Sequence, residues 1–70
     1  MNKKTVKTVE RRILKAMMED ERQLRVLLET ETENIHEEQL DGLMVKIEQL
    51  LGRIMVNQNK LMLLQDIKDE

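Results

Sequence analysis

The stretch NIHEEQLDGLMVKIEQLLGRIMVNQNKLMLLQDI, residues 34–67, decides the fold because apolar residues recur in it every three or four positions. With Leu40 at position a of a heptad, seven of the eight a and d positions are aliphatic. These positions are Leu40, Leu43, Ile47, Leu50, Ile54, Asn57, Leu61 and Leu64. The run VNQNK contains neither Gly nor Pro, and the heptad resumes in phase after it. We therefore predict one helix over about residues 34–67.

The predicted seam contains one polar residue, Asn57. A buried Asn in such a seam fixes the register and the oligomeric state at some cost in stability, whereas the alternative role is a hydrogen-bonding site for a ligand. We favour the structural role, in which Asn57 specifies register. The start of the helix is predicted from Asn34 and Glu37, which have the spacing of a capping box.

A second amphipathic pattern precedes this one and predicts a helix over about residues 5–29. Its apolar residues follow steps of three, four and seven: Val6, Val9, Ile13, Met17, Leu24, Leu27 and Leu28. Asp20 occupies a position in this stripe where an apolar residue is expected. Two helices joined by a short connection form an antiparallel hairpin, so we predict an all-α fold of this kind.

Length and composition indicate how such a hairpin is stabilised. Centring the turn near Thr32 places Met17 opposite Ile47 and leaves residues beyond Asn59 without a partner on the first helix. The 70 residues, taken as one complete domain, are too few to build a large core. The chain has no Cys and one His, which excludes disulfides and argues against structural zinc. We therefore expect the hairpin to dimerise into a four-helix bundle or coiled-coil assembly.

The second half of the later helix is apolar on two sides. Gly52, Met55, Val56, Asn59, Met62 and Leu63 lie opposite the a and d positions. A helix that is apolar on two sides is buried on two sides, either in a homodimer core, which we favour, or against a different protein. Together with the unpartnered end of the helix, this pattern predicts an intermolecular surface made of Met55, Val56, Leu61, Met62, Leu63, Leu64 and Ile67.

Charge is segregated along the chain although the net charge is only −2. Residues 1–16 hold six cations and one anion, whereas residues 19–41 hold nine anions and two cations. Four cations form a basic stripe at helical spacing: Lys4, Lys7, Arg11 and Lys15. This stripe could bind phosphates without reading bases. We favour a solvated face that pairs with Glu10 or with the acidic tail, Asp66, Asp69 and Glu70.

Composition disfavours several other functions. No aromatic residue is present, so the stacking platforms that bind single-stranded nucleic acid are missing. No apolar stretch is long enough for a membrane span or a signal peptide, and the lack of Cys fits a cytoplasmic protein. His36 lacks a calcium-loop spacing and a nucleophile–base pair, so we predict no catalytic residue, metal site or cofactor. We interpret the run EDE, residues 19–21, as solvated too.

One short motif resembles a known family. EEQLDGLMVKI, residues 37–47, is similar to the SQELD-x-L-I signature of the small Spo0E-like aspartyl-phosphate phosphatases. Leu40, Asp41 and Leu43 match, whereas Glu37 stands where that family has Ser. The heptad accounts for the same residues. The resemblance implies a helical hairpin that acts on a phosphorylated response regulator.

These patterns together indicate a function without enzymatic activity. We expect a small protein–protein interaction module that acts as a homodimer and regulates or inhibits other proteins in a bacterium or its phage. One alternative is a helical dimer that binds nucleic acid through the basic stripe. The other is a regulator of a phosphorylated signalling protein, as the resemblance implies.

Overall fold

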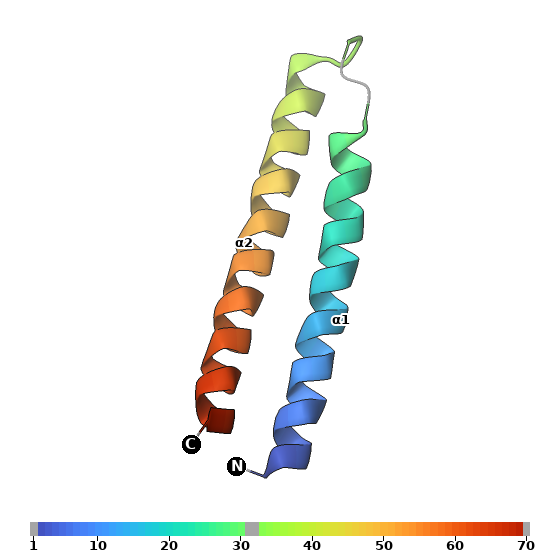
Figure 1. Ribbon diagram of the computed structural model, residues 1–70. Helices are drawn as coiled ribbons and strands as arrows, with labels where there is room; N and C mark the ends of the chain where they lie inside the picture. The colour runs from blue at the N-terminus through green and yellow to red at the C-terminus, as the bar shows by residue number, and fades with distance from the viewer. Residues whose placement is uncertain (1, 31–32, 70) are drawn as a thin grey trace.

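The chain folds as two long antiparallel α-helices in the computed structural model (Figure 1). The structure describes residues 2–30 and 33–69. Helix α1 spans Lys3–Leu28 and helix α2 spans Glu37–Asp69, and no strand occurs among the described residues. The all-α hairpin expected from the two amphipathic patterns is confirmed. Thr32, the predicted centre of the turn, lies outside the described residues.

Helix α1 begins two residues earlier than predicted because Asn2 caps it. The Asn2 side chain accepts a hydrogen bond from the backbone N–H of Lys4 at 2.7 Å, which satisfies one free donor of the first turn. At the other end, the backbone N–H of Glu29 donates to the carbonyl of Arg25 at 3.0 Å. The apolar stripe begins only at Val6, so the stripe alone could not place this cap.

Helix α2 runs without interruption through VNQNK, as predicted, but it begins at Glu37 instead of Asn34. The predicted capping box of Asn34 and Glu37 is wrong. The backbone N–H of His36 donates to Oε1 of Gln39 at 3.3 Å, and the His36 carbonyl accepts from the N–H of Leu40 at 2.9 Å. Gln39 therefore supplies the reciprocal half of a capping box that lies two residues later.

The core of the hairpin is thin. Five apolar side chains are buried among the described residues: Val6, Met17, Leu50, Ile54 and Leu64. The rod measures 53 × 14 × 12 Å. Its radius of gyration is 16.3 Å, compared with about 11 Å for a compact domain of this length. Two helices enclose only the seam between them, so most side chains keep contact with solvent.

The register between the helices differs from the predicted one. Nη2 of Arg53 on α2 donates to Oδ1 of Asp20 on α1 at 2.8 Å. The predicted register paired Met17 with Ile47. In an antiparallel hairpin, a residue later than Met17 on α1 then meets a residue earlier than Ile47 on α2. Arg53 lies later instead, so the predicted register is wrong.

The corrected register gives the end of α2 a partner within the chain. Nζ of Lys68 donates to Oε2 of Glu10 at 2.6 Å. Leu64 is only 7% exposed, and Leu61 and Ile67 are half-buried. The expectation that residues beyond Asn59 lack a partner on the first helix is therefore wrong.

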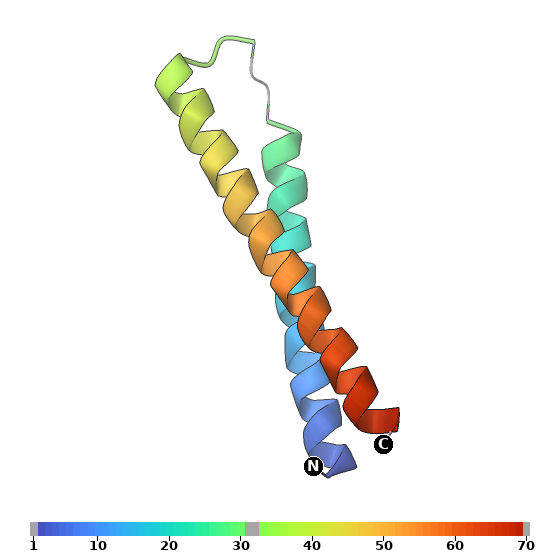
Figure 2. The ribbon, with the colours of Figure 1, turned by 90° about the vertical axis from the view of Figure 1, so that its left-hand side faces the viewer.

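The unpartnered part of α2 lies at the turn end of the rod. Figures 1 and 2 show α2 continuing past the end of α1, and Figure 2 shows the two helices crossing and then diverging toward the turn. The first turns of α2 accordingly leave Leu40, Met44 and Val45 exposed. The pairs Asp20–Arg53 and Glu10–Lys68 thus place α2 further toward the turn end than the predicted register does.

Candidate protein-binding face of helix α2

The candidate site is a face of α2 that points away from the seam with α1. We name it the outer face. It consists of Met44, Val45, Leu51, Gly52, Met55, Val56, Met62 and Leu63. In the heptad these residues occupy positions b, c and f, which lie opposite a and d, and position e, which flanks the seam. All eight are exposed.

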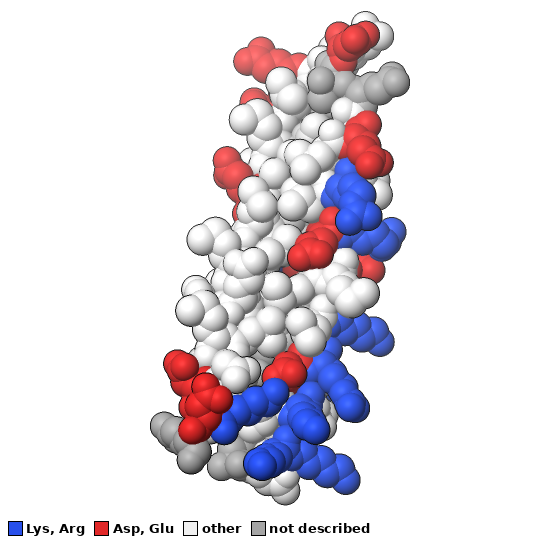
Figure 3. All heavy atoms as spheres, in the orientation of Figure 1, with Lys and Arg blue, Asp and Glu red and all other residues white. Residues whose placement is uncertain are grey.

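The outer face is apolar and yet open to solvent. Met62 is 67% exposed and Met55 is 62% exposed. Figure 3 shows a broad uncharged surface along the middle of the rod. Among the described residues, twelve large apolar side chains are exposed, compared with five that are buried. Scattered exposed apolar residues are normal, but apolar residues gathered on one face of a helix, here interrupted only by Glu48, Gln49, Gln58 and Asn59, are typical of an interaction surface.

The structure divides the seven residues of the predicted interface into two groups. Met55, Val56, Met62 and Leu63 lie on the outer face and are exposed. Leu61, Leu64 and Ile67 face α1 and contribute to the seam of the hairpin. The prediction that these three belong to the intermolecular surface followed from the wrong register, and their correct place is the core.

The sequence prediction missed three residues of the outer face: Met44, Val45 and Leu51. They extend the same apolar pattern toward the start of α2. Val45 lies two turns before Gly52 at the same heptad position, f, and Met44 and Leu51 occupy the neighbouring position e. The heptad spacing could therefore have predicted these three residues. They were missed because the wrong register left the end of α2, and not its start, without a partner on α1.

Gly52 lies at the middle of the outer face and of α2. A Cβ at this position would meet no atom within 4 Å. Gly in a helix interior costs about 1 kcal/mol relative to Ala, and no contact within the chain requires it here. Gly52 leaves room for the backbone of another helix to approach closely.

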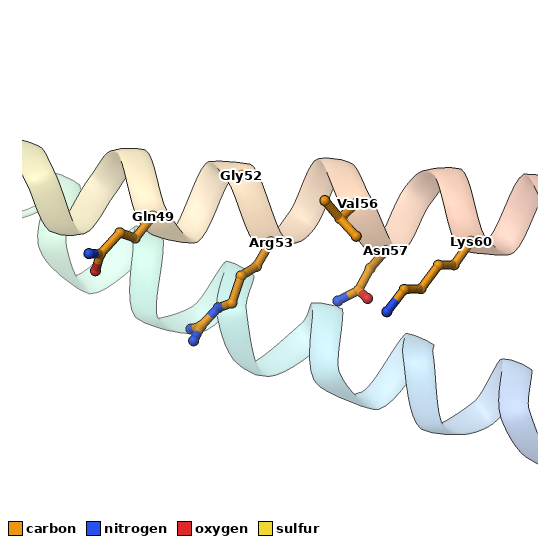
Figure 4. A pocket seen from close by; sticks show the side chains of 6 residues that line it. All are labelled: Gln49, Gly52, Arg53, Val56, Asn57 and Lys60. Carbon is orange, nitrogen blue, oxygen red and sulfur yellow. The ribbon is translucent and has the colours of Figure 1, made fainter.

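A polar row lies along the edge of α2. Gln49, Arg53, Asn57 and Lys60 extend toward the side on which α1 lies, along an open depression (Figure 4). Asn57 is half-buried. No buried side-chain N or O among the described residues lacks a partner, so the Asn57 amide is not a stranded buried group. The polar position in the seam is observed, and its role in specifying register stays a prediction.

The side chains of the run EDE, residues 19–21, lie in different environments: Asp20 lies in the seam and Glu19 lies in solvent. Asp20 is 7% exposed and pairs with Arg53, whose side chain stays mostly in solvent. Glu19 points outward and accepts a hydrogen bond from Arg22 at 2.6 Å. Hydrogen bonds from Arg22 and then from Gln23 lower the pKa of Glu19 to about 2. The interpretation of the whole run as solvated is therefore wrong for Asp20.

The basic stripe lies on the exposed surface of α1. Lys4, Lys7, Arg11 and Lys15 are exposed, and within the described part of the chain none forms an ion pair. The pairing with Glu10 is not observed, because Glu10 binds Lys68. Glu70 of the acidic tail lies outside the described residues. Figure 3 shows Lys and Arg gathered over the N-terminal half of α1.

A metal-binding cluster and a membrane-spanning helix are both absent from the described residues. Within residues 2–30 and 33–69, no three His, Asp or Glu side chains gather where they could hold a metal ion. His36 is exposed just before the first turn of α2. In the part of the chain that the structure describes, neither helix has the length and apolarity needed to cross a membrane.

Comparison of the chain with known protein families found no matching family. No curated protein and no solved structure matched it either. Residues 37–47, which carry the resemblance to the aspartyl-phosphate phosphatases, form the first three turns of α2 with Asp41 exposed. The function is therefore inferred from the outer face and from the distribution of charge.

Proposed function

We propose that this chain is a non-enzymatic protein–protein interaction module that works as a homodimer through the outer face of α2. The observation that carries the proposal is the excess of exposed over buried large apolar side chains among the described residues. Burying one such side chain stabilises a protein by roughly 1.5–3 kcal/mol. A hairpin with so thin a core therefore gains much of its stability by covering this face.

The composition of the outer face suits a second copy of the chain. The face consists of Met, Leu and Val with one Gly, which resembles the interior of a domain more than an ordinary surface. Met side chains adapt to the shape of the surface they meet. Two hairpins joined through their outer faces would place four helices in a row, with the two α2 helices in the middle and α1 of each copy on the outside.

Charged substitutions on the outer face test this proposal. Met62→Glu combined with Leu63→Glu should convert the dimer into single hairpins, because both side chains are exposed and lie away from the seam. Helical content should persist, since the seam is untouched. Light scattering measures the mass, and circular dichroism measures the helix content.

The matched control is Val26→Glu. Val26 is 56% exposed on α1 and does not belong to the outer face, so this variant should keep the native mass. The proposal fails if the double variant keeps the native mass, or if the control loses it to the same extent.

Binding of nucleic acid by the basic stripe is a second candidate function. The observation that favours it is the exposure of four cations that form no ion pair within the described residues. Contacts to phosphates weaken steeply as salt rises. Retention on a DNA column that falls with salt, and that is lost when Lys4, Lys7, Arg11 and Lys15 are replaced by Gln, would support this function. If the chain is not retained, or if retention survives the replacements, the basic stripe is not a nucleic-acid-binding site.

A further inference from the structure

The outer side of α2 has the same pattern of apolar and polar residues in both directions. Two neighbouring rows follow the helix at alternating steps of four and three. The first row is Met44, Glu48, Leu51, Met55, Gln58 and Met62, and the second is Val45, Gln49, Gly52, Val56, Asn59 and Leu63. Each row has the order non-polar, polar, non-polar, non-polar, polar, non-polar. A second copy that runs in the opposite direction therefore places non-polar positions opposite non-polar ones and polar opposite polar.

The ends of the rod carry opposite charge. Residues 3–16, with six cations and one anion, lie toward the end where α1 begins and α2 finishes (Figure 1). Toward the turn end, the described residues 19–30 and 33–41 hold eight anions and two cations. A parallel pair would place like charges together and would set Glu48 against Glu48 of the second copy. An antiparallel pair places the basic end of each copy beside the acidic end of the other.

Gly52 lies where an antiparallel pair would cross. Helix α2 spans Glu37–Asp69, so Gly52 lies next to its midpoint. The first row is symmetric about residue 53, so the two-fold axis of an antiparallel pair that matches this row passes beside that residue, next to Gly52. The two backbones approach most closely there, and the missing Cβ removes the obstacle to that approach. Within one chain, no described atom occupies the space that a Cβ of residue 52 would fill.

We infer that two copies of the chain pair antiparallel through α2, with Met44 of each copy beside Met62 of the other and with Gly52 at the crossing. This inference rests on the proposed homodimer and adds its orientation and register. The interface is isologous, because each copy contributes the same face. Each half of the outer face is then covered by the opposite half of the second copy.

Engineered cysteines test the orientation directly, because the chain has no Cys of its own. Three variants are needed: Met44→Cys, Met62→Cys and the variant with both substitutions. Both positions are exposed, so the hairpin should tolerate the changes. In an antiparallel pair the two copies of residue 44 lie about 27 Å apart at 1.5 Å per residue, far beyond the reach of a disulfide. Under mild oxidation only the variant with both substitutions should form covalent dimers, which migrate at twice the mass on a non-reducing gel.

Each other outcome overturns a specific statement. Covalent dimers from either single variant would show a parallel pair and refute the orientation, while the proposed homodimer would stand. No covalent dimer from any variant, with a native mass that is dimeric, would refute pairing through this register of α2. A native chain with the mass of one hairpin would refute the homodimer itself and the orientation with it.

Discussion

At the scale of single residues, polar groups in the seam fix how the helices align. A purely apolar heptad seam can slide by a turn and still bury similar surface. The ion pairs of Asp20 with Arg53 and of Glu10 with Lys68 can form in one register only, so we expect them to limit such sliding. The sequence showed that Asp20 interrupts the apolar stripe. It could not show the partner, because several cations on α2 have a similar reach.

Removing the partner of Asp20 should destabilise the hairpin. We expect Arg53→Met to lower the free energy of unfolding by roughly 1–2 kcal/mol, since a buried carboxylate loses its hydrogen bond while the exposed side of Arg53 limits the loss. Adding Asp20→Leu to Arg53→Met should restore stability, because a seam position then holds an apolar residue. Chemical denaturation at fixed protein concentration measures each change.

The matched control for this cycle is Arg22→Met, which breaks the exposed ion pair with Glu19. It should leave stability nearly unchanged. Equal losses from Arg53→Met and Arg22→Met would show that burial of Asp20 contributes nothing to the strength of its ion pair.

Asn57 should limit the alternatives that the seam can adopt instead of adding stability. We expect Asn57→Leu to raise the melting temperature and to permit a change in assembly size, because an aliphatic residue completes the seam. Thermal unfolding and light scattering test both effects. A large loss of stability with an unchanged mass would mean that Asn57 satisfies a specific polar group.

At the scale of the elements, α2 packs on one side and exposes an apolar surface on the other. The a and d positions of the heptad predicted the inner side, and the b, c and f positions predicted part of the outer face. The start of α2 could not be predicted, because Asn34 with Glu37 and His36 with Gln39 both offer capping groups at the right spacing. The predicted register was wrong because it assumed that both helices end level at the turn, whereas α2 extends past the end of α1 (Figures 1 and 2). The predicted interface was displaced with it.

The two glycines of α2 provide a matched pair of variants. A Cβ added at Gly42 or at Gly52 would have no neighbour within 4 Å, so Arg fits both sites within one chain. Both Gly42→Arg and Gly52→Arg should make the helix more stable, because Arg is a much better helix former than Gly. Only Gly52→Arg should separate the two copies, since Gly52 lies at the proposed crossing. Light scattering that shows the native mass for Gly52→Arg would contradict a close approach at this residue.

At the scale of the whole molecule, the chain is a thin rod with segregated charge. The all-α class followed from the sequence because two amphipathic patterns without Pro leave few other folds. The heptad alone places Leu61 and Leu64 on the seam and Met62 and Leu63 off it. The structure was needed to show that α1 reaches far enough along α2 to cover Leu61, Leu64 and Ile67. The symmetry of the outer face and the distribution of charge along the rod favour a second copy of the chain as the partner.

The most direct test of the homodimer is the mass of the native chain in solution across a range of micromolar concentrations. We predict twice the single-chain mass of 8.4 kDa by light scattering, together with a melting temperature that rises with protein concentration. Association stabilises the folded state by mass action, so the two observations should appear together. A mass of 8.4 kDa with a cooperative thermal transition that does not depend on concentration would contradict the account.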